Sequence, residues 1–140
     1  MAGTNTTNAI LRSIDYGKNW TSVLSSNGYP ARFAVNNSTI MALISLASGY
    51  YLSNDNGVTW GSKIIPVGTT GSYSGGVWSF NNRWFLSDGN IPKRLIYSDV
   101  LQPTASDWTE VSGINNVTFI VLFGTTLYAV SDGGNVSQSR

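Results

Sequence analysis

Hydrophobic and polar residues alternate in short runs along this chain. Runs of four to seven aliphatic, aromatic and β-branched residues are separated by Asn, Gly and Ser, which is the pattern of strands joined by turns. Apolar residues spaced three and four apart do not persist over the about 11 residues that an amphipathic helix requires. The pattern therefore predicts an all-β protein.

The strand-like runs recur in the same order, which predicts an internal repeat. Residues 33–60 contain two strands joined by a tight turn, a third strand and a short fourth strand. Residues 77–108 repeat this order with an insertion before the last strand, and residues 120–139 begin it again. Four antiparallel strands in a repeat of about 40 to 45 residues are typical of one blade of a β-propeller.

A polar motif follows the third strand of a unit. The pattern S-x-D-x-G-x-x-W is written as SIDYGKNW at residues 13–20 and as SNDNGVTW at residues 53–60. Its defined residues are Ser13, Asp15, Gly17 and Trp20 in the first copy and Ser53, Asp55, Gly57 and Trp60 in the second. We expect the aspartate to close a turn by accepting hydrogen bonds from backbone N–H groups two residues on. The glycine is expected to take a positive φ, and the tryptophan to fill the space between neighbouring blades.

This motif resembles the Asp-box, or BNR repeat, of sialidases and related β-propellers, in which the box lies between the third and fourth strands of a blade. A third copy departs from the pattern, because it keeps Ser98, Asp99 and Trp108 but lacks the glycine and is longer. The resemblance covers about residues 9–139 and implies a six-bladed ring.

The repeats are out of phase with the chain ends. Residues 9–20 supply only the third and fourth strands of a blade, whereas the C-terminal part supplies the first, the second and a candidate third at residues 136–138. With the two whole repeats this makes about three blades, too few to close a ring. We expect a homodimer with six blades, in which each split blade is completed within a chain or by the partner's terminus. A trimer with extra blades and a fragment of a longer protein are the alternatives.

Composition narrows the picture further. The chain is expected to form a single unit over residues 1–140, with residues 1–8 as a candidate disordered tail. Charged residues make up only 11% and the net charge is +1, so no basic stripe is available for nucleic acid. No apolar run approaches the length of a membrane span, and the polar start lacks the pattern of a signal peptide. These features predict a soluble protein, cytoplasmic or associated with a virus particle.

The missing residue types exclude several chemistries. Cysteine and histidine are absent, which excludes disulfides, Ser-His-Asp catalysis and a typical zinc site. One carboxylate per box is too few for calcium at Asp15 or Asp55, so we expect neither a metal nor a cofactor. Sialidase activity, as the resemblance implies, needs a Tyr paired with a Glu, three arginines and an acid/base Asp. The single glutamate, Glu110, lies on an expected fourth strand, and no pair of convergent carboxylates can be assembled for glycoside hydrolysis.

The five tryptophans are expected to belong to the core. Trp20, Trp60 and Trp108 follow the boxes. Trp78 and Trp84 offer an alternative as a platform for sugar rings. The repeat nevertheless favours the core for both, because it aligns Trp78 with Phe33 and Val121, and Trp84 with Ile40 and Leu127.

A binding face is expected where the repeats differ, on the loops opposite the boxes. The candidate ligand-binding side chains are Tyr29, Arg32, Tyr73, Asp88, Lys93, Arg94 and Asp132. The leading hypothesis is a non-enzymatic, lectin-like oligomer that binds carbohydrate through this face. The alternatives are a structural or assembly component, for example of a virus particle, and a reduced sialidase-like glycosidase.

Overall fold

The computed structural model confirms the all-β prediction. It describes residues 8–26, 29–45, 49–69, 76–88, 93–132 and 136–138. All regular structure within these residues is β-strand, arranged in four antiparallel sheets that follow one another along the chain. The candidate tail lies outside the described residues except for Asn8, which begins the first strand.

The first two sheets use the N-terminal half of the chain. The first sheet pairs β1 (Asn8–Arg12) with β2 (Thr21–Ser26). The second sheet has the order β3 (Tyr29–Asn36), β4 (Thr39–Ser45) and β5 (Gly49–Ser53). The first sheet therefore holds only the strands on either side of a box, as the sequence predicts.

A short extended segment adds a rudimentary fourth strand to the second sheet. The N–H of Gly61 donates to the carbonyl of Leu52 at 2.9 Å, and Tyr50 and Ile64 exchange two backbone hydrogen bonds of 2.9 Å. Gly49 makes this approach possible: its φ is 143°, and a Cβ there would lie 2.7 Å from the carbonyl oxygen of Ile64. The segment pairs too briefly to form a full strand.

The third and fourth sheets complete the chain. The third contains β6 (Gly76–Phe80), β7 (Arg83–Ser87), β8 (Arg94–Ser98) and β9 (Thr109–Asn115). The fourth contains β10 (Val117–Phe123), β11 (Thr126–Ser131) and β12 (Val136–Gln138). The candidate third strand at residues 136–138 is confirmed, and it pairs with β11.

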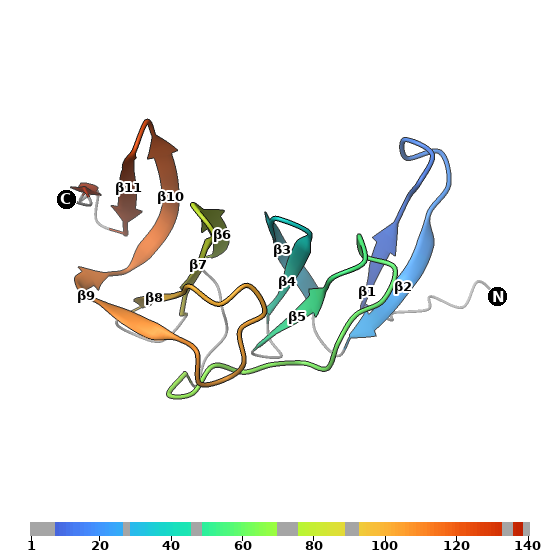
Figure 1. Cartoon of the computed structure of the whole chain (residues 1–140), viewed down its shortest axis with the longest axis horizontal. Helices are drawn as coiled ribbons and strands as arrows, with labels where there is room; N and C mark the ends of the chain where they lie inside the picture. The colour runs from blue at the N-terminus through green and yellow to red at the C-terminus, as the bar shows by residue number, and fades with distance from the viewer. Residues whose placement is uncertain are drawn as a thin grey trace.

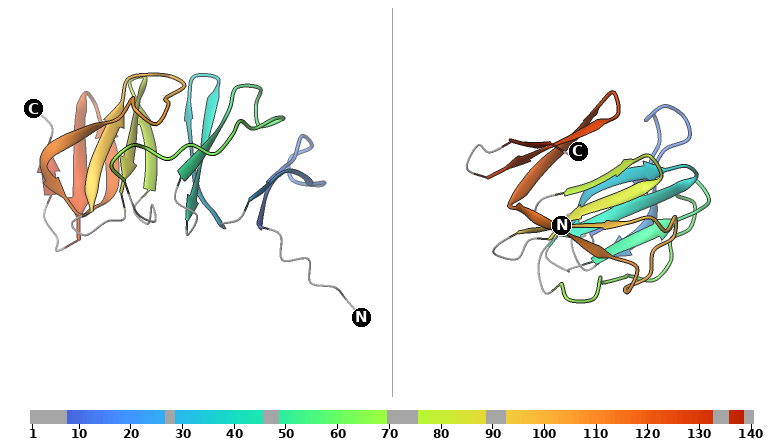
Figure 2. Two further views of the ribbon diagram at one scale, coloured as in Figure 1. Left: turned by 90° about the horizontal axis from the view of Figure 1, so that it is seen from below. Right: turned by 60° about the vertical axis from the view of Figure 1, so that its left-hand side comes forward.

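The sheets stand side by side in an open row, with β1 and β2 at one end and β10 and β11 at the other (Figure 1). The strands that begin successive sheets are neighbours, since β3 lies against β6 and β6 against β10. Box turns and hairpin turns gather at one end of the strands, and β9 passes into β10 at the other (Figure 2, left). Any ligand face on the connections is therefore separated from the boxes by the length of the strands.

Two apolar clusters lie between the sheets and join them. The cluster between the second and third sheets contains Met41, Leu43, Tyr50, Val77, Trp84, Leu86 and Ile96. The cluster between the third and fourth sheets contains Phe85, Leu95, Val117, Ile120 and Ala129. Burying these side chains between sheets supplies the main driving force for ordering the row.

The tryptophans follow the prediction only in part. Trp84 is fully buried and donates from Nε1 to the carbonyl of Leu101 at 3.0 Å. Trp108 packs against the first cluster and donates to the hydroxyl of Tyr50 at 3.1 Å. Trp20 differs, because it is 60% exposed at the N-terminal end of the row.

The strand register also corrects one alignment of the repeats. Trp78 pairs with Phe85 on β7, and the equivalent residue on β3, opposite Met41, is Ala34 rather than Phe33. Phe33 is equivalent to Val77 instead. A shift of one residue reverses the face on which a side chain lies, so Phe33 points toward the first sheet and not toward the third.

Candidate functional site

The two complete boxes form the same hydrogen-bonded turn. Ser53 Oγ accepts from the N–H of Gly57 at 2.8 Å, and Asp55 Oδ1 accepts from the N–H of Thr59 at 2.9 Å. In the first box the corresponding bonds are 2.8 Å to Ser13 and 2.9 Å to Asp15. The aspartate thus reaches four residues on, and not two as expected, because the serine occupies the nearer N–H groups.

These bonds also set the acidity of the box aspartates. The Thr59 hydroxyl and then its backbone N–H lower the pKa of Asp55 from 3.8 to about 2. The pKa of Asp15 is also lowered, mainly by the backbone N–H of Asn19 and then by its side-chain amide. Both carboxylates are used by their own turns, which agrees with a structural role.

The third copy of the box is built differently. Ser98 Oγ accepts from the N–H of Val100 at 3.2 Å, but Asp99 turns away and forms an ion pair of 2.5 Å with Arg83. Asp107 closes the longer turn by accepting from the N–H of Thr104 at 2.7 Å. The assignment of Asp99 as the box aspartate is therefore wrong, and Asp107 has that role because the insertion moves the turn along the chain.

Four of the predicted ligand-binding residues meet at the opposite end of the strands. Arg94, at the start of β8, forms an ion pair of 2.9 Å with Asp88 and one of 3.3 Å with Glu110 on β9. Its Nη2 also donates to the carbonyl of Gly68 at 2.6 Å. The hydrogen bond to Asp88 is the main cause of a raised pKa of Arg94. Asp88 is fully buried, whereas Glu110 remains half exposed.

A second pair lies beside this arrangement. Lys93 Nζ is 2.5 Å from Asp132 Oδ2, which joins the β7–β8 connection to the end of β11. Asn116 holds the two segments in place: its N–H donates to the carbonyl of Lys93 at 2.6 Å, and its carbonyl accepts from the N–H of Asp132 at 2.8 Å. Asn116 is not among the residues expected from the sequence to bind a ligand. Its φ of 58° places it in a tight turn.

The remaining candidates do not join this group. Tyr29 and Arg32 were expected in a loop but belong to β3. Strand β2 ends at Ser26 and β3 already begins at Tyr29. Tyr73 lies outside the described residues. Strand β9 continues to Asn115, so that a single residue separates it from β10.

The chemistry available to this group is recognition of polar groups. Lys93, Glu110 and Asp132 present charged atoms that are partly open to solvent. Asp88 and Glu110 share the guanidinium of Arg94, and Asp88 is buried. Within the described ranges, no three acidic side chains come together in a geometry that could hold a metal ion.

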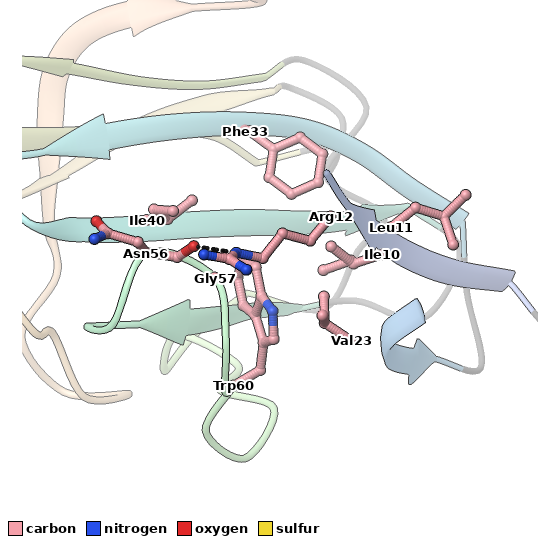
Figure 3. A pocket seen from close by; sticks show the side chains of 9 residues that line it. All are labelled: Ile10, Leu11, Arg12, Val23, Phe33, Ile40, Asn56, Gly57 and Trp60. Carbon is pink, nitrogen blue, oxygen red and sulfur yellow. Dashed lines mark hydrogen bonds between the residues drawn. The ribbon is translucent and has the colours of Figure 1, made fainter. Parts of the chain in front are cut away.

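A separate apolar cavity of about 280 Å³ opens between the first and second sheets (Figure 3). Phe33 and Trp60 line it from the second sheet, with ring centroids 6.4 Å apart. Ile10 and Arg12 line it from β1, and Arg12 Nε donates to the carbonyl of Asn56 at 2.9 Å. Val77, the equivalent of Phe33 in the third sheet, is only 4% exposed and belongs to the cluster between the second and third sheets, whereas Phe33 is 52% exposed beside the cavity.

Exposed apolar side chains form two stripes, one on the fourth sheet and one on the face of the second sheet that points toward the first. Phe119, Val121 and Phe123 alternate along β10 and so share one face, which points away from the third sheet. Phe33 and Val35 alternate on β3 beside the cavity. On β6, which lies between β3 and β10, Val77 is buried and Trp78 is half buried. Exposed stripes of this kind are typical of surfaces that bind another protein.

No protein-family model and no curated protein matches the sequence. Within the described segments, no helix is long and apolar enough to cross a membrane.

Proposed function

We propose that the chain is a non-enzymatic assembly unit, and that two copies close a ring of six propeller-like blades. The apolar stripes on β3 of the second sheet and on β10 of the fourth sheet are the observation that carries this proposal. At the equivalent positions of β6, Val77 is buried and Trp78 is half buried against the neighbouring sheets. The stripes on β3 and β10 are therefore the kind of apolar surface that a further sheet covers.

The two stripes fit each other by their places in the repeat. The inner strand β6 uses one face toward β3 and the other toward β10. On β10, Phe119, Val121 and Phe123 lie on the face that corresponds to the β10-facing side of β6. On β3, Phe33 and Val35 lie on the face that corresponds to the β3-facing side of β6. Placing β10 of a partner beside β3 would continue the series and cover the cavity. A single ring is closed when the partner makes the same contact in return.

The native mass in solution tests this proposal. Light scattering on a size-exclusion column should give twice the mass of one chain for the parent protein. Phe123→Ser and Val35→Ser should each shift the population toward one chain, because they remove exposed apolar area from opposite stripes.

Val67→Ser is the matched control. Val67 is 73% exposed but lies in the connection between the second and third sheets, away from both stripes. Its substitution should leave the mass unchanged. A parent protein that stays a single chain at all concentrations would contradict the proposal, as would equal effects of the three substitutions.

The charged group on the connections favours carbohydrate as a ligand of the assembled ring. Glu110 and Asp132 hold carboxylate oxygens at the surface, fixed by Arg94 and Lys93, and such oxygens accept hydrogen bonds from sugar hydroxyls. Screening on a glycan array, with the double variant Glu110→Gln and Asp132→Asn as comparison, tests this function. Binding that the double variant loses supports it; no binding by an assembled parent protein contradicts it.

A further inference from the structure

Strands β1 and β12 occupy the same place in the repeat. In the second and third sheets, the third strand pairs with the second in one register, given by Met41–Leu52, Ala42–Tyr51, Phe85–Tyr97 and Leu86–Ile96. In the fourth sheet the equivalent pairs are Tyr128–Gln138 and Ala129–Ser137. Strand β12 therefore lies on β11 as a third strand in the correct register.

A serine at the end of each third strand supports the same equivalence. Ser53 and Ser98, which begin a box, end β5 and β8. Ser13 follows β1 in the same way, and Ser139 follows Gln138 in the sequence. The chain thus carries two candidate third strands for its split blade, one at each end.

Strand β1 is paired differently from the third strands of the second and third sheets. In the part of the chain that the structure describes, β1 pairs with β2 alone, whereas β5 and β8 each have pairing on both sides. Leu11 on β1 is 54% exposed, but Ile96 at the equivalent place on β8 is only 5% exposed. An unpaired strand edge with apolar side chains is a template for another strand.

From these equivalences we propose that β1 of one copy pairs with the outer edge of β11 of a second copy, in the place that β12 occupies within the chain. Ile10, Leu11 and Arg12 would then lie opposite Val130, Ala129 and Tyr128. This inference rests on the proposed assembly and names the strands that join the copies. The last strand of the chain becomes a competitor of assembly.

Replacing β12 by β1 of the second copy would lengthen the strand pairing on β11. Strand β12 pairs with β11 through three residues, whereas β1 has five residues and brings β2 with it as a fourth strand. A four-stranded sheet then replaces one sheet of three strands and one of two.

Cysteine cross-linking tests the register, because the chain has no cysteine of its own. A Leu11→Cys chain is mixed with an Ala129→Cys chain under mild oxidation, and the disulfide between residues 11 and 129 is identified by mass spectrometry. Directly paired residues lie within disulfide range. We expect this disulfide in at least tenfold excess over the one formed when Ala42→Cys replaces Ala129→Cys, because Ala42 is already opposite Tyr51.

The outcomes separate the two proposals. If the mixture has the mass of two chains but the disulfide between residues 11 and 129 does not exceed the control, the strand exchange is wrong and the assembly stands. If the native mass is that of one chain, both are wrong.

The competition has its own test in the double variant Val136→Pro and Ser137→Pro. Successive N–H groups of a strand point to opposite sides, so one of the two prolines removes a hydrogen bond to β11. Both chains of the two-fold assembly must release β12. If β12 holds the edge of β11 in nine tenths of the free chains, removing its hold on both should therefore lower the dissociation constant of the assembly by about a hundredfold. A chain ending at Asp132 should behave alike; an unchanged or higher dissociation constant in both would overturn the competition.

Discussion

Single residues in this protein act mainly through short hydrogen bonds within their own turn. Asp55 accepts from the backbone N–H of Thr59 and from its hydroxyl, so its charge stabilises one turn and no distant group. Asn81 and Asn82, with φ of 49° and 63°, similarly form the β6–β7 hairpin turn, in which asparagine tolerates the left-handed conformation.

The lowered pKa of Asp55 predicts a specific loss of stability in acid. Because its pKa falls from 3.8 to about 2 on folding, its contribution is fully present above about pH 4 and is lost as the pH falls toward 2. Asp55→Asn should lower the urea midpoint at pH 7 and flatten its decline between pH 4 and 2. Urea titrations followed by tryptophan fluorescence measure both.

Thr59→Val provides an internal comparison for this prediction. It removes the hydroxyl donor to Asp55 but keeps the backbone donor, so the acid decline should be intermediate. A decline in Asp55→Asn as steep as in the parent protein would show that other groups cause it.

At the scale of elements, local backbone geometry shapes the outer pairing of the second and third sheets. The rudimentary fourth strand of the second sheet approaches β5 because Gly49 has no side chain. In the third sheet, a register shift between Arg94 and Ile96 bends β9 against β8 and leaves Glu110 within reach of Arg94.

Gly49→Ala should therefore destabilise the second sheet. Its Cβ would meet the carbonyl oxygen of Ile64 at 2.7 Å in a backbone conformation that alanine rarely adopts, so we expect a loss of about 1 to 3 kcal/mol in the free energy of unfolding. Denaturant titration measures it.

Gly61→Ala is the control on the same pairing. Its Cβ would lie 3.7 Å from the carbonyl of Leu52, which is ordinary contact, so the change should stay within about 0.5 kcal/mol. Equal losses in the two variants would mean that the close approach at Gly49 is not what holds the segment.

The whole molecule is a row of four sheets, with a sheet of two strands at one end and a sheet of three strands at the other. The two apolar clusters lie between the second, third and fourth sheets, and the first sheet meets the second around the cavity at Phe33 and Trp60. A second copy bound as proposed would add contact area beside this cavity.

Stability should consequently rise with protein concentration. If two folded copies unfold together, a tenfold increase in concentration stabilises the assembly by about 1.4 kcal/mol, which corresponds to about 2 to 4 °C in Tm. Calorimetric scans over a hundredfold range of concentration measure this shift. Phe123→Ser should abolish it, and a Tm of the parent protein that does not depend on concentration would contradict joint unfolding.

The sequence by itself determined the features that depend on near neighbours. The strands follow from alternation, and both complete box turns follow from hydrogen bonds between residues at most four apart, as Ser53, Asp55 and Gly57 show. The third strand at residues 136–138 could be predicted because the repeat fixes its order.

Only the tertiary structure decided which distant groups meet. The ion pairs of Arg94 with Asp88 and Glu110 depend on a connection and on a register shift that no local pattern indicates. The exposure of Trp20 likewise depends on which sheets cover the N-terminal end. Strand pattern is set by the residues themselves, whereas contacts across sheets depend on register and on the presence of a neighbouring sheet.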